Sequence, residues 1–210
     1  MSVTLWPAPG IHFAAVEEDI VVLDTYAGSY SCLLSASDWL RLEQDQTLAV
    51  DDADAAAELV EANLAVQQRP RSTRPATPPA RRDYRPDQLA GRIPSLGTIA
   101  EIMIARQSFR GTAFPDLLRL RLPRRRLISG SLENALSDYQ AALPWCPGEG
   151  ECFQRAFELR YLLARRGVMA TWVFGVRTWP FAAHCWLQLE DAVIGDSIDR
   201  VQRYTPIFAV

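Results

Sequence analysis

A proline- and arginine-rich segment lies near the middle of this chain and divides it in two. Residues 67–86 contain five prolines and six arginines, with apolar side chains too sparse to form a buried face. A segment of this composition favours an extended conformation over a packed one. We therefore expect a linker at 67–86 that joins an N-terminal domain over residues 1–66 to a C-terminal domain over residues 87–210.

The charged residues are divided along the chain in the same way. Residues 1–66 hold one arginine and twelve acidic residues, residues 67–130 have a net charge of +10, and the rest is close to neutral. Opposed blocks of charge are typical of separate functional parts. All 22 basic residues are arginine, which excludes a lysine Schiff base and a phosphate-loop lysine. Few aromatic residues lie among these arginines, so we expect no nucleic-acid binding.

The sequence carries no pattern of a membrane-spanning or secreted protein. The first residues lack a basic region followed by a long apolar run, and the most apolar internal stretch, residues 168–176, is too short to cross a bilayer. Four cysteines at irregular spacing fit a reduced compartment better than a disulfide framework. We therefore expect a cytoplasmic protein that binds no membrane.

In the N-terminal domain, apolar runs broken by acidic or glycine-containing turns predict three strands, at residues 11–15, 19–24 and 30–34. A capping-box pattern beginning at Ser35 predicts a short helix that ends at Glu43. Apolar residues at helical spacing predict a second helix over residues 51–66. The expected result is a small three-stranded sheet with helices.

In the C-terminal domain, helical periodicity predicts helices within residues 88–109, 114–122 and 131–143. A further amphipathic helix begins near Cys152 and ends at Gly167. Strand-like runs follow, at residues 170–176, 183–189 and 193–196. Helices followed by an antiparallel sheet, together with the N-terminal sheet, indicate an α+β fold class.

Cys152 is the leading candidate for a catalytic residue. It lies in the first turn of its predicted helix, where free backbone N–H groups and the helix dipole favour a thiolate. His184, one of only two histidines, lies in a predicted strand, and Asp196 follows twelve residues later, a separation that suits a hairpin. These residue types predict a nucleophile, a base and an orienting acid. Because strand residues alternate between faces, we expect Cys185 to face away from His184 into the sheet core.

Other interpretations of these residues stay open. Cys152 could be a core thiol beneath a structural histidine, and Asp199 is a rival to Asp196 as the orienting acid. The backbone N–H of Cys152 and the side chain of Gln140 or Trp145 are candidate donors to an oxyanion. A zinc site is disfavoured by its ligand spacing and would use Cys146, Cys152, His184 and Cys185.

The C-terminal part of the chain also resembles a known family. The stretches that carry this resemblance are residues 152–155, 159–168, 174–177, 180–186 and 203–207. They resemble the transglutaminase-like and papain-like cysteine enzymes and, within that set, the leader-peptidase B proteins of lasso-peptide biosynthesis. The chain departs from the family pattern at Cys185, where alanine is commoner, and at residues 153–154.

This resemblance implies a fold, an activity and partners. The fold would be a transglutaminase-like domain with its cysteine on a helix, and the activity would be that of a cysteine endopeptidase. The enzyme would remove the leader from a ribosomally made lasso-peptide precursor and free the amine of the core peptide for cyclisation. The implied partners are the precursor and an ATP-using lasso cyclase. We expect no cofactor or metal in this chain, so that any ATP dependence would come through the cyclase.

The stretch from Asp19 to Tyr30 is similar to the peptide-recognition element of enzymes that modify ribosomal peptides. That similarity implies that the leader adds to the sheet edge at residues 30–34, against an apolar wall from the second helix. The candidate leader-binding residues are Tyr30, Leu33, Leu59 and Val66.

Two other functions fit the same residues. One is an acyltransferase, such as a transglutaminase, in which an amine replaces water in resolving the thioester. The other is a peptide-binding adaptor that keeps the fold without catalysis. The products separate transfer from hydrolysis, and the reactivity of Cys152 separates either enzyme from an adaptor.

Overall fold

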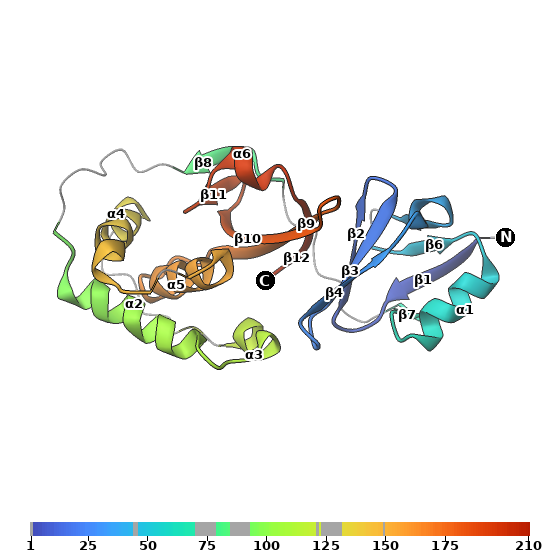
Figure 1. Ribbon diagram of the computed structural model, residues 1–210, viewed down its shortest axis with the longest axis horizontal. Coiled ribbons are helices and arrows are strands. Elements are labelled where there is room, and N and C mark those ends of the chain that lie inside the picture. The colour runs from blue at the N-terminus through green and yellow to red at the C-terminus, as the bar shows by residue number, and fades with distance from the viewer. Residues whose placement is uncertain are drawn as a thin grey trace. The chain divides into compact units, whose positions relative to one another are not determined.

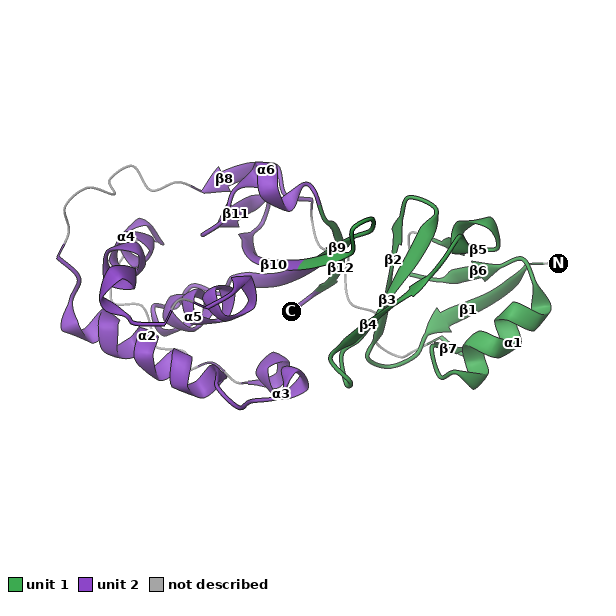
Figure 2. Cartoon of the chain, viewed as in Figure 1, with its two compact units in different colours: residues 1–77, 175–183, 204–208 green, residues 78–174, 184–203, 209–210 purple. Residues whose placement is uncertain are grey.

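The structure is a computed structural model that describes residues 2–43, 46–69, 79–84, 93–120, 122, 132–148 and 150–210. The chain forms two compact units. The first unit comprises residues 1–77, 175–183 and 204–208, and the second comprises residues 78–174, 184–203 and 209–210 (Figure 2). Two short C-terminal segments, residues 175–183 and 204–208, thus belong to the first unit, although the predicted N-terminal domain ended at residue 66.

An antiparallel sheet of three strands lies in the first unit (Figure 1), formed in the order β2 (Ile11–Val16), β3 (Asp19–Asp24) and β4 (Ser29–Leu33). These are the three strands predicted from the sequence. The central strand β3 is buried from Asp19 to Leu23, whereas β4 is an edge strand whose residues are exposed or half-buried. β2 pairs with β3 and β3 pairs with β4, so two successive hairpins place β4 at the edge of the sheet.

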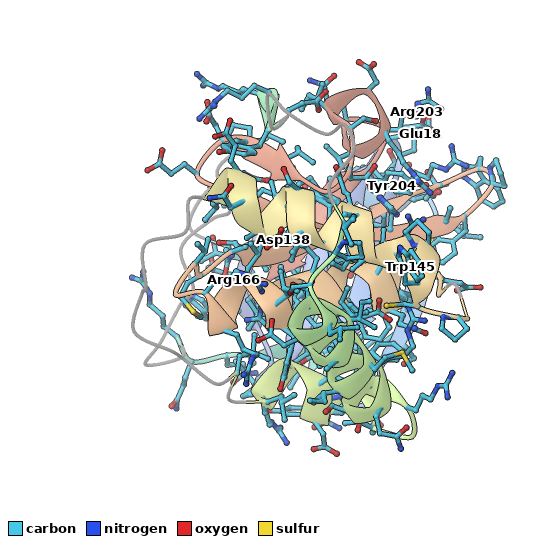
Figure 3. All side chains as sticks on the ribbon, turned by 90° about the vertical axis from the view of Figure 1, so that its left-hand side faces the viewer. Glu18, Asp138, Trp145, Arg166, Arg203 and Tyr204 are labelled. Carbon is cyan, nitrogen blue, oxygen red and sulfur yellow. The ribbon has the colours of Figure 1, made fainter. Side chains whose placement is uncertain are left out.

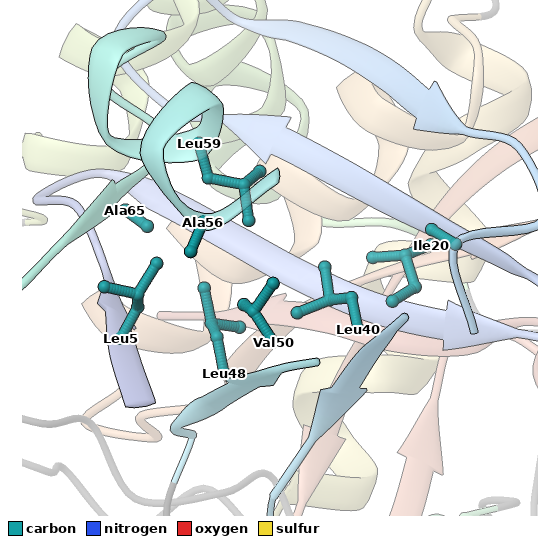
Figure 4. Packing of buried hydrophobic residues seen from close by; sticks show 9 residues of the cluster. Leu5, Ile20, Leu40, Leu48, Val50, Ala56, Leu59 and Ala65 are labelled. Atoms are coloured by element: carbon teal, nitrogen blue, oxygen red, sulfur yellow. The ribbon is translucent and has the colours of Figure 1, made fainter. Parts of the chain in front are cut away.

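A second sheet in this unit has four strands, in the order β5 (Leu40–Leu42), β6 (Leu48–Val50), β1 (Val3–Pro7) and β7 (Ala65–Val66). Helix α1 (Ala53–Glu61) is preceded by Asp52, whose side chain accepts a hydrogen bond from the backbone N–H of Asp54. This is the N-cap arrangement that stabilises a helix start. The buried side chains of these elements and of β3 form one core, drawn in Figure 4, which includes Leu5, Ile20, Leu40, Leu48, Val50, Ala56, Leu59 and Ala65.

Two helix predictions in this unit need correction. Instead of a helix from Ser35 to Glu43, the chain has a short 3-10 helix, η1 (Ala36–Asp38), followed by strand β5. Ser35 has a left-handed backbone and does not cap the helix, and Leu40 is buried in the core. The helix predicted over residues 51–66 ends at Glu61, because Ala65–Val66 pairs with β1. In both places sheet pairing overrides the local helical pattern.

The predicted linker also contains a strand, so the prediction is wrong at that point. Within residues 67–86, β8 (Arg82–Tyr84) pairs in parallel with β11 (Ala192–Ile194), and the Arg82 side chain contacts Asp191 at 3.0 Å. Sheet pairing between segments distant in sequence leaves no local signature. Residues 70–78 and 85–86 of the predicted linker lie outside the described residues.

The second unit contains a group of helices and most of a five-stranded sheet (Figure 1). The helices are α2 (Leu96–Phe109), α3 (Phe114–Arg119), α4 (Leu132–Ala142), η2 (Leu143–Trp145), α5 (Cys152–Arg165) and α6 (Ile198–Val201). The sheet has the order β12 (Thr205–Ala209), β9 (Thr171–Arg177), β10 (Ala182–Leu189), β11 and β8. The predicted α+β class is confirmed, although α6 and β12 were not foreseen.

Helix α5 is the centre of this unit, and it is buried for most of its length. It contacts α2 and α4, and its aromatic residues pack on the sheet. The Phe153 ring stacks on Trp172 of β9 with centroids 5.1 Å apart, and Phe157 meets the same indole at 6.0 Å. Buried aromatic pairs of this kind add specific geometry to a large burial of apolar area. They fix the first two turns of α5, which carry Cys152, on the sheet.

The C-terminal end of α5 is held by ionic contacts. Glu101 of α2 accepts hydrogen bonds from Arg165 and Arg166, both at 2.9 Å, and Arg166 also lies 3.8 Å from Asp138 of α4 (Figure 3). Gly167, in the left-handed region with φ 81°, then ends the helix as the sequence predicted. Among the residues that the structure describes, no helix is long and apolar enough to cross a membrane.

Candidate active site

Cys152 is the first residue of α5. Glu151 precedes it in an extended conformation, and its side chain makes no capping hydrogen bond. The N–H groups of the first turn are therefore not capped by that side chain, and a helix N-terminus favours negative charge. The Cys152 side chain is half-buried, so it is held in place and yet reachable.

Hydrogen bonds from Arg106 of α2 hold the turn that leads into α5. Its Nη1 atom donates hydrogen bonds to the backbone carbonyls of Cys146, at 3.2 Å, and of Pro147. Its Nε atom donates to Glu158 of α5 at 2.8 Å. One buried guanidinium therefore joins α2, the turn and the helix that carries Cys152. Sequence analysis missed this residue, because a single arginine in an apolar helix carries no signal of its partners.

His184 of β10 and Asp196 meet through the hairpin that the sequence predicted. The Leu187–Ile194 pairing, extended along the antiparallel register, places the residues after β11 beside His184. His184 Nε2 and Asp196 Oδ2 are 2.6 Å apart, and Asp196 Oδ1 accepts a hydrogen bond from the Ser197 backbone at 2.8 Å. The carboxylate is thus fixed at both oxygens. Asp199, the rival acid, lies in α6.

Gly195 allows this close approach. Its φ is 73°, and a Cβ atom at this position would lie 2.6 Å from the Leu159 side chain of α5. A larger residue would therefore force the end of the buried Leu159 side chain to move and would be strained in its own backbone. Gly195 therefore lies close to α5, the same helix that carries Cys152.

Cys152 and His184 are joined by a side-chain hydrogen bond. Since His184 Nε2 faces Asp196, the nitrogen that faces the thiol is Nδ1. Hydrogen bonds from the side chains of Cys185 and His184 lower the pKa of Cys152 to about 4. Burial lowers the pKa of His184, but hydrogen bonds to Asp196 and Cys152 outweigh burial and raise it to about 9. Near neutral pH the pair is therefore a thiolate and an imidazolium.

The prediction for Cys185 is wrong. Its thiol hydrogen-bonds to Cys152 instead of facing away, and its backbone also bonds to the Cys152 sulfur. The pairing of β10 with β11 covers Leu187–Leu189, and Cys185 precedes it. The Cys152 sulfur thus lies against the backbone of β10, where side chains from both faces can reach it. The alternation of side chains along a strand predicts the face on which Cys185 lies. It does not predict where Cys152 of the neighbouring helix lies relative to that strand.

These residues line one pocket of about 590 Å³. Its walls come from α4, α5, β10 and the chain after β11, and Gln140 contributes to the α4 wall. Trp145, the other candidate oxyanion donor, has 65% of its surface exposed and is not among the lining residues. Gln140 is therefore the better placed of the two side chains.

Arg155 and Arg200 also line the pocket and make part of its wall cationic. Among the described residues, no group of three or more histidine, cysteine or acidic side chains could hold a metal ion.

The candidate leader-binding residues lie in the first unit. Tyr30 and Leu33 are half-buried on the edge strand β4, and the Tyr30 ring is 5.8 Å from that of Phe181. Leu59 does not form an exposed wall: it is 4% exposed and fills the core described above. Val66 belongs to β7 and is half-buried. Leu59 therefore does not form the expected apolar wall, because its side chain points from α1 into the core of the unit.

Comparison with known proteins assigns the family. A model of the transglutaminase-like superfamily matches residues 98–209, more than half of the chain. The chain therefore belongs to the transglutaminase-like superfamily, whose members are typically cysteine peptidases or transglutaminases. The matched region contains Cys152, His184 and Asp196. Searches of curated proteins and of solved structures gave no significant match.

Proposed function

We propose that this protein is a cysteine endopeptidase. The main support for this proposal is that Cys152, His184 and Asp196 are hydrogen-bonded in series and line one pocket. A nucleophile, a base in contact with it and an acid that orients the base are the components of covalent catalysis by hydrolases.

The chemistry follows from the protonation states. The Cys152 thiolate attacks the carbonyl carbon of the scissile bond, and the His184 imidazolium gives its proton to the departing amine. Water then attacks the thioester while neutral His184 takes a proton from it, which releases a carboxylate and restores the thiolate. Asp196 holds the imidazole in its tautomer and stabilises the imidazolium. The Cys152 backbone N–H and the Gln140 side chain are the candidate donors to the oxyanion.

The substrate we propose is a lasso-peptide precursor, cut between leader and core. This finer assignment rests on the resemblance of residues 152–207 to leader-peptidase B proteins. In this proposal the protein acts in the cytoplasm beside a lasso cyclase, which would use the freed amine and supply any ATP dependence. A peptide substrate suits a half-buried nucleophile that lines a pocket of this size.

The leader would be held by β-strand addition on β4. A strand at the edge of a sheet presents backbone groups that can pair with an extended peptide. Tyr30 and Leu33 are half-buried there and would contact alternate side chains of the leader. The acidic N-terminal part of the chain would favour leaders with basic or neutral residues.

The test is to incubate the full chain with a candidate precursor and identify the products by mass spectrometry. The expected result is a leader with a free carboxylate and a core with a free N-terminal amine, and Cys152→Ala is the inactive control. A new amide between the leader and an added amine would instead assign the acyltransferase function, which the superfamily also contains. No reaction with a precursor, despite a reactive Cys152, would reject the lasso substrate and leave the substrate class open.

A further inference from the structure

The candidate nucleophile has a second thiol in direct contact with it. The side chains of Cys152 and Cys185 hydrogen-bond to one another, and both line the same pocket. Cys185 is only 4% exposed, whereas Cys152 is half-buried at the start of α5. A reagent that enters the pocket therefore reaches Cys152 first and finds Cys185 behind it.

The proposed peptidase mechanism does not use the chemical reactivity of Cys185. Hydrolysis needs one sulfur, one imidazole and one carboxylate, and the Cys185 thiol serves there only as a hydrogen-bond donor. A neighbouring thiol is instead what a reactive thiolate requires in order to form a disulfide.

We propose that Cys152 and Cys185 are a redox-sensitive pair, in which a peroxide oxidises Cys152 and Cys185 then converts it to a disulfide that blocks the nucleophile reversibly. Structural disulfides are rare in reduced compartments, where the cysteine pairs that form them are typically transient or redox-sensing.

The disulfide would form in two steps, oxidation of Cys152 by peroxide and then attack by Cys185. The Cys152 thiolate attacks one oxygen of hydrogen peroxide, the O–O bond breaks, and the products are a sulfenic acid and, after protonation, water. Cys185 then attacks the sulfenic sulfur; the S–S bond forms, the S–O bond breaks, and the hydroxyl leaves as water with the Cys185 proton. Peroxide is reduced by two electrons and the two thiols are oxidised by one each.

The environment favours this order of events. Cys152 is the thiolate of the pair, since the Cys185 thiol donates to it, and oxidation by peroxide follows thiolate character. The hydrogen bond between the two thiols holds their sulfur atoms close together, as a disulfide between them requires. The other two cysteines differ in position: Cys32 lies exposed in the first unit, and Cys146 is buried at the end of η2.

The test treats the full chain with hydrogen peroxide at neutral pH, blocks free thiols, and measures intact and peptide masses without reduction. The expected result is a loss of two hydrogens, a cross-linked peptide pair containing Cys152 and Cys185, and full recovery of Cys152 labelling after dithiothreitol. With Cys185→Ala or Cys185→Ser, Cys152 should instead gain two oxygens as a sulfinic acid, which dithiothreitol does not reverse. The serine variant keeps the size of the side chain, so a folding defect in the alanine variant does not decide the outcome.

Cys146→Ala is the matched control, because it removes another buried thiol of the same unit and should leave the disulfide unchanged. Irreversible oxidation of Cys152 in the unmodified chain, or a disulfide from Cys152 to any other cysteine, would overturn the inference. These masses need no peptide substrate. The thiol pair and the proposed peptidase function can therefore fail independently.

Discussion

Arg106 of α2 and Glu158 of α5 form a buried ion pair with two hydrogen bonds, from Nε to Oε1 at 2.8 Å and from Nη2 to Oε2 at 3.0 Å. Their side chains are 4% and 0% exposed. The same guanidinium supports the carbonyls of the turn before Cys152, so the pair links the stability of the unit to the position of Cys152.

Removing one partner of this pair should be costly. We expect Arg106→Met to lower the free energy of unfolding by about 3–5 kcal/mol, because Glu158 is left buried without its counter-charge. The exposed pair of Arg82 and Asp191 in the same unit offers a control, and Arg82→Gln should cost less than about 1 kcal/mol. Denaturant unfolding measures both. Equal effects of the two substitutions would show that the buried pair has no special role.

The geometry also predicts how the site residues divide in function. Cys152→Ala, Cys152→Ser and His184→Ala should abolish turnover while leaving the fold and peptide binding intact, because each removes a reacting group and little core volume. Asp196→Asn should be slower without being inactive, since the acid orients the imidazole and does not react. Turnover on a precursor and circular dichroism of each variant check these outcomes. An active Cys152→Ala would refute the assignment.

The paired ionisation predicts a bell-shaped dependence of kcat/KM on pH. Activity should fall as pH drops through about 4, where the Cys152 thiolate is protonated, and fall again as pH rises through about 9, where His184 loses the proton that the leaving amine needs. Cys185→Ala should move the acidic limb upward, because the hydrogen bond from Cys185 is the largest cause of the low pKa. A limb that stays in place in this variant would show that Cys185 does not tune the thiolate.

Two glycines with the same backbone angle separate strain from steric clash. Gly195 and Gly111 both have φ 73°, but only at Gly195 would a Cβ atom meet a neighbour, Leu159 at 2.6 Å. Gly111→Ala should cost about 1–2 kcal/mol from the left-handed backbone alone. Gly195→Ala should destabilise more and also slow turnover, because it displaces Asp196. Thermal unfolding and steady-state kinetics measure the difference, and equal losses at both sites would refute the close approach.

The recognition proposal predicts a change in binding rather than in chemistry. Tyr30→Ala on β4 should raise KM for the full precursor and leave kcat at saturating substrate nearly unchanged. The substitution removes a contact with the leader and no group that takes part in cleavage. Fluorescence anisotropy with the full chain should show that the leader peptide binds and the core peptide does not. If Tyr30→Ala altered neither KM nor leader affinity, β4 would not be the binding edge.

The sequence predicted the elements that depend on local periodicity and caps. Strands β2 to β4 and helix α5 with its stop at Gly167 were found in this way, as was the approach of Asp196 to His184, which follows from hairpin geometry. The failures share one cause. Residues 40–42 pair with β6 and residues 82–84 pair with β11, and the contact of Cys185 with Cys152 depends on how α5 packs on β10. A local pattern holds no information about such tertiary contacts.

Trapping the acyl-enzyme tests whether Cys152 is the nucleophile that cuts the precursor. A precursor is mixed with the full chain, the reaction is stopped with acid within the first turnover, and the intact mass of the protein is measured. We predict an added mass equal to that of the free leader acid less one water, located on Cys152 by peptide mapping, released by hydroxylamine and absent in Cys152→Ala, with the core peptide already free. Cleavage that proceeds at the same rate in Cys152→Ala, with no adduct on the unmodified chain, would contradict the account.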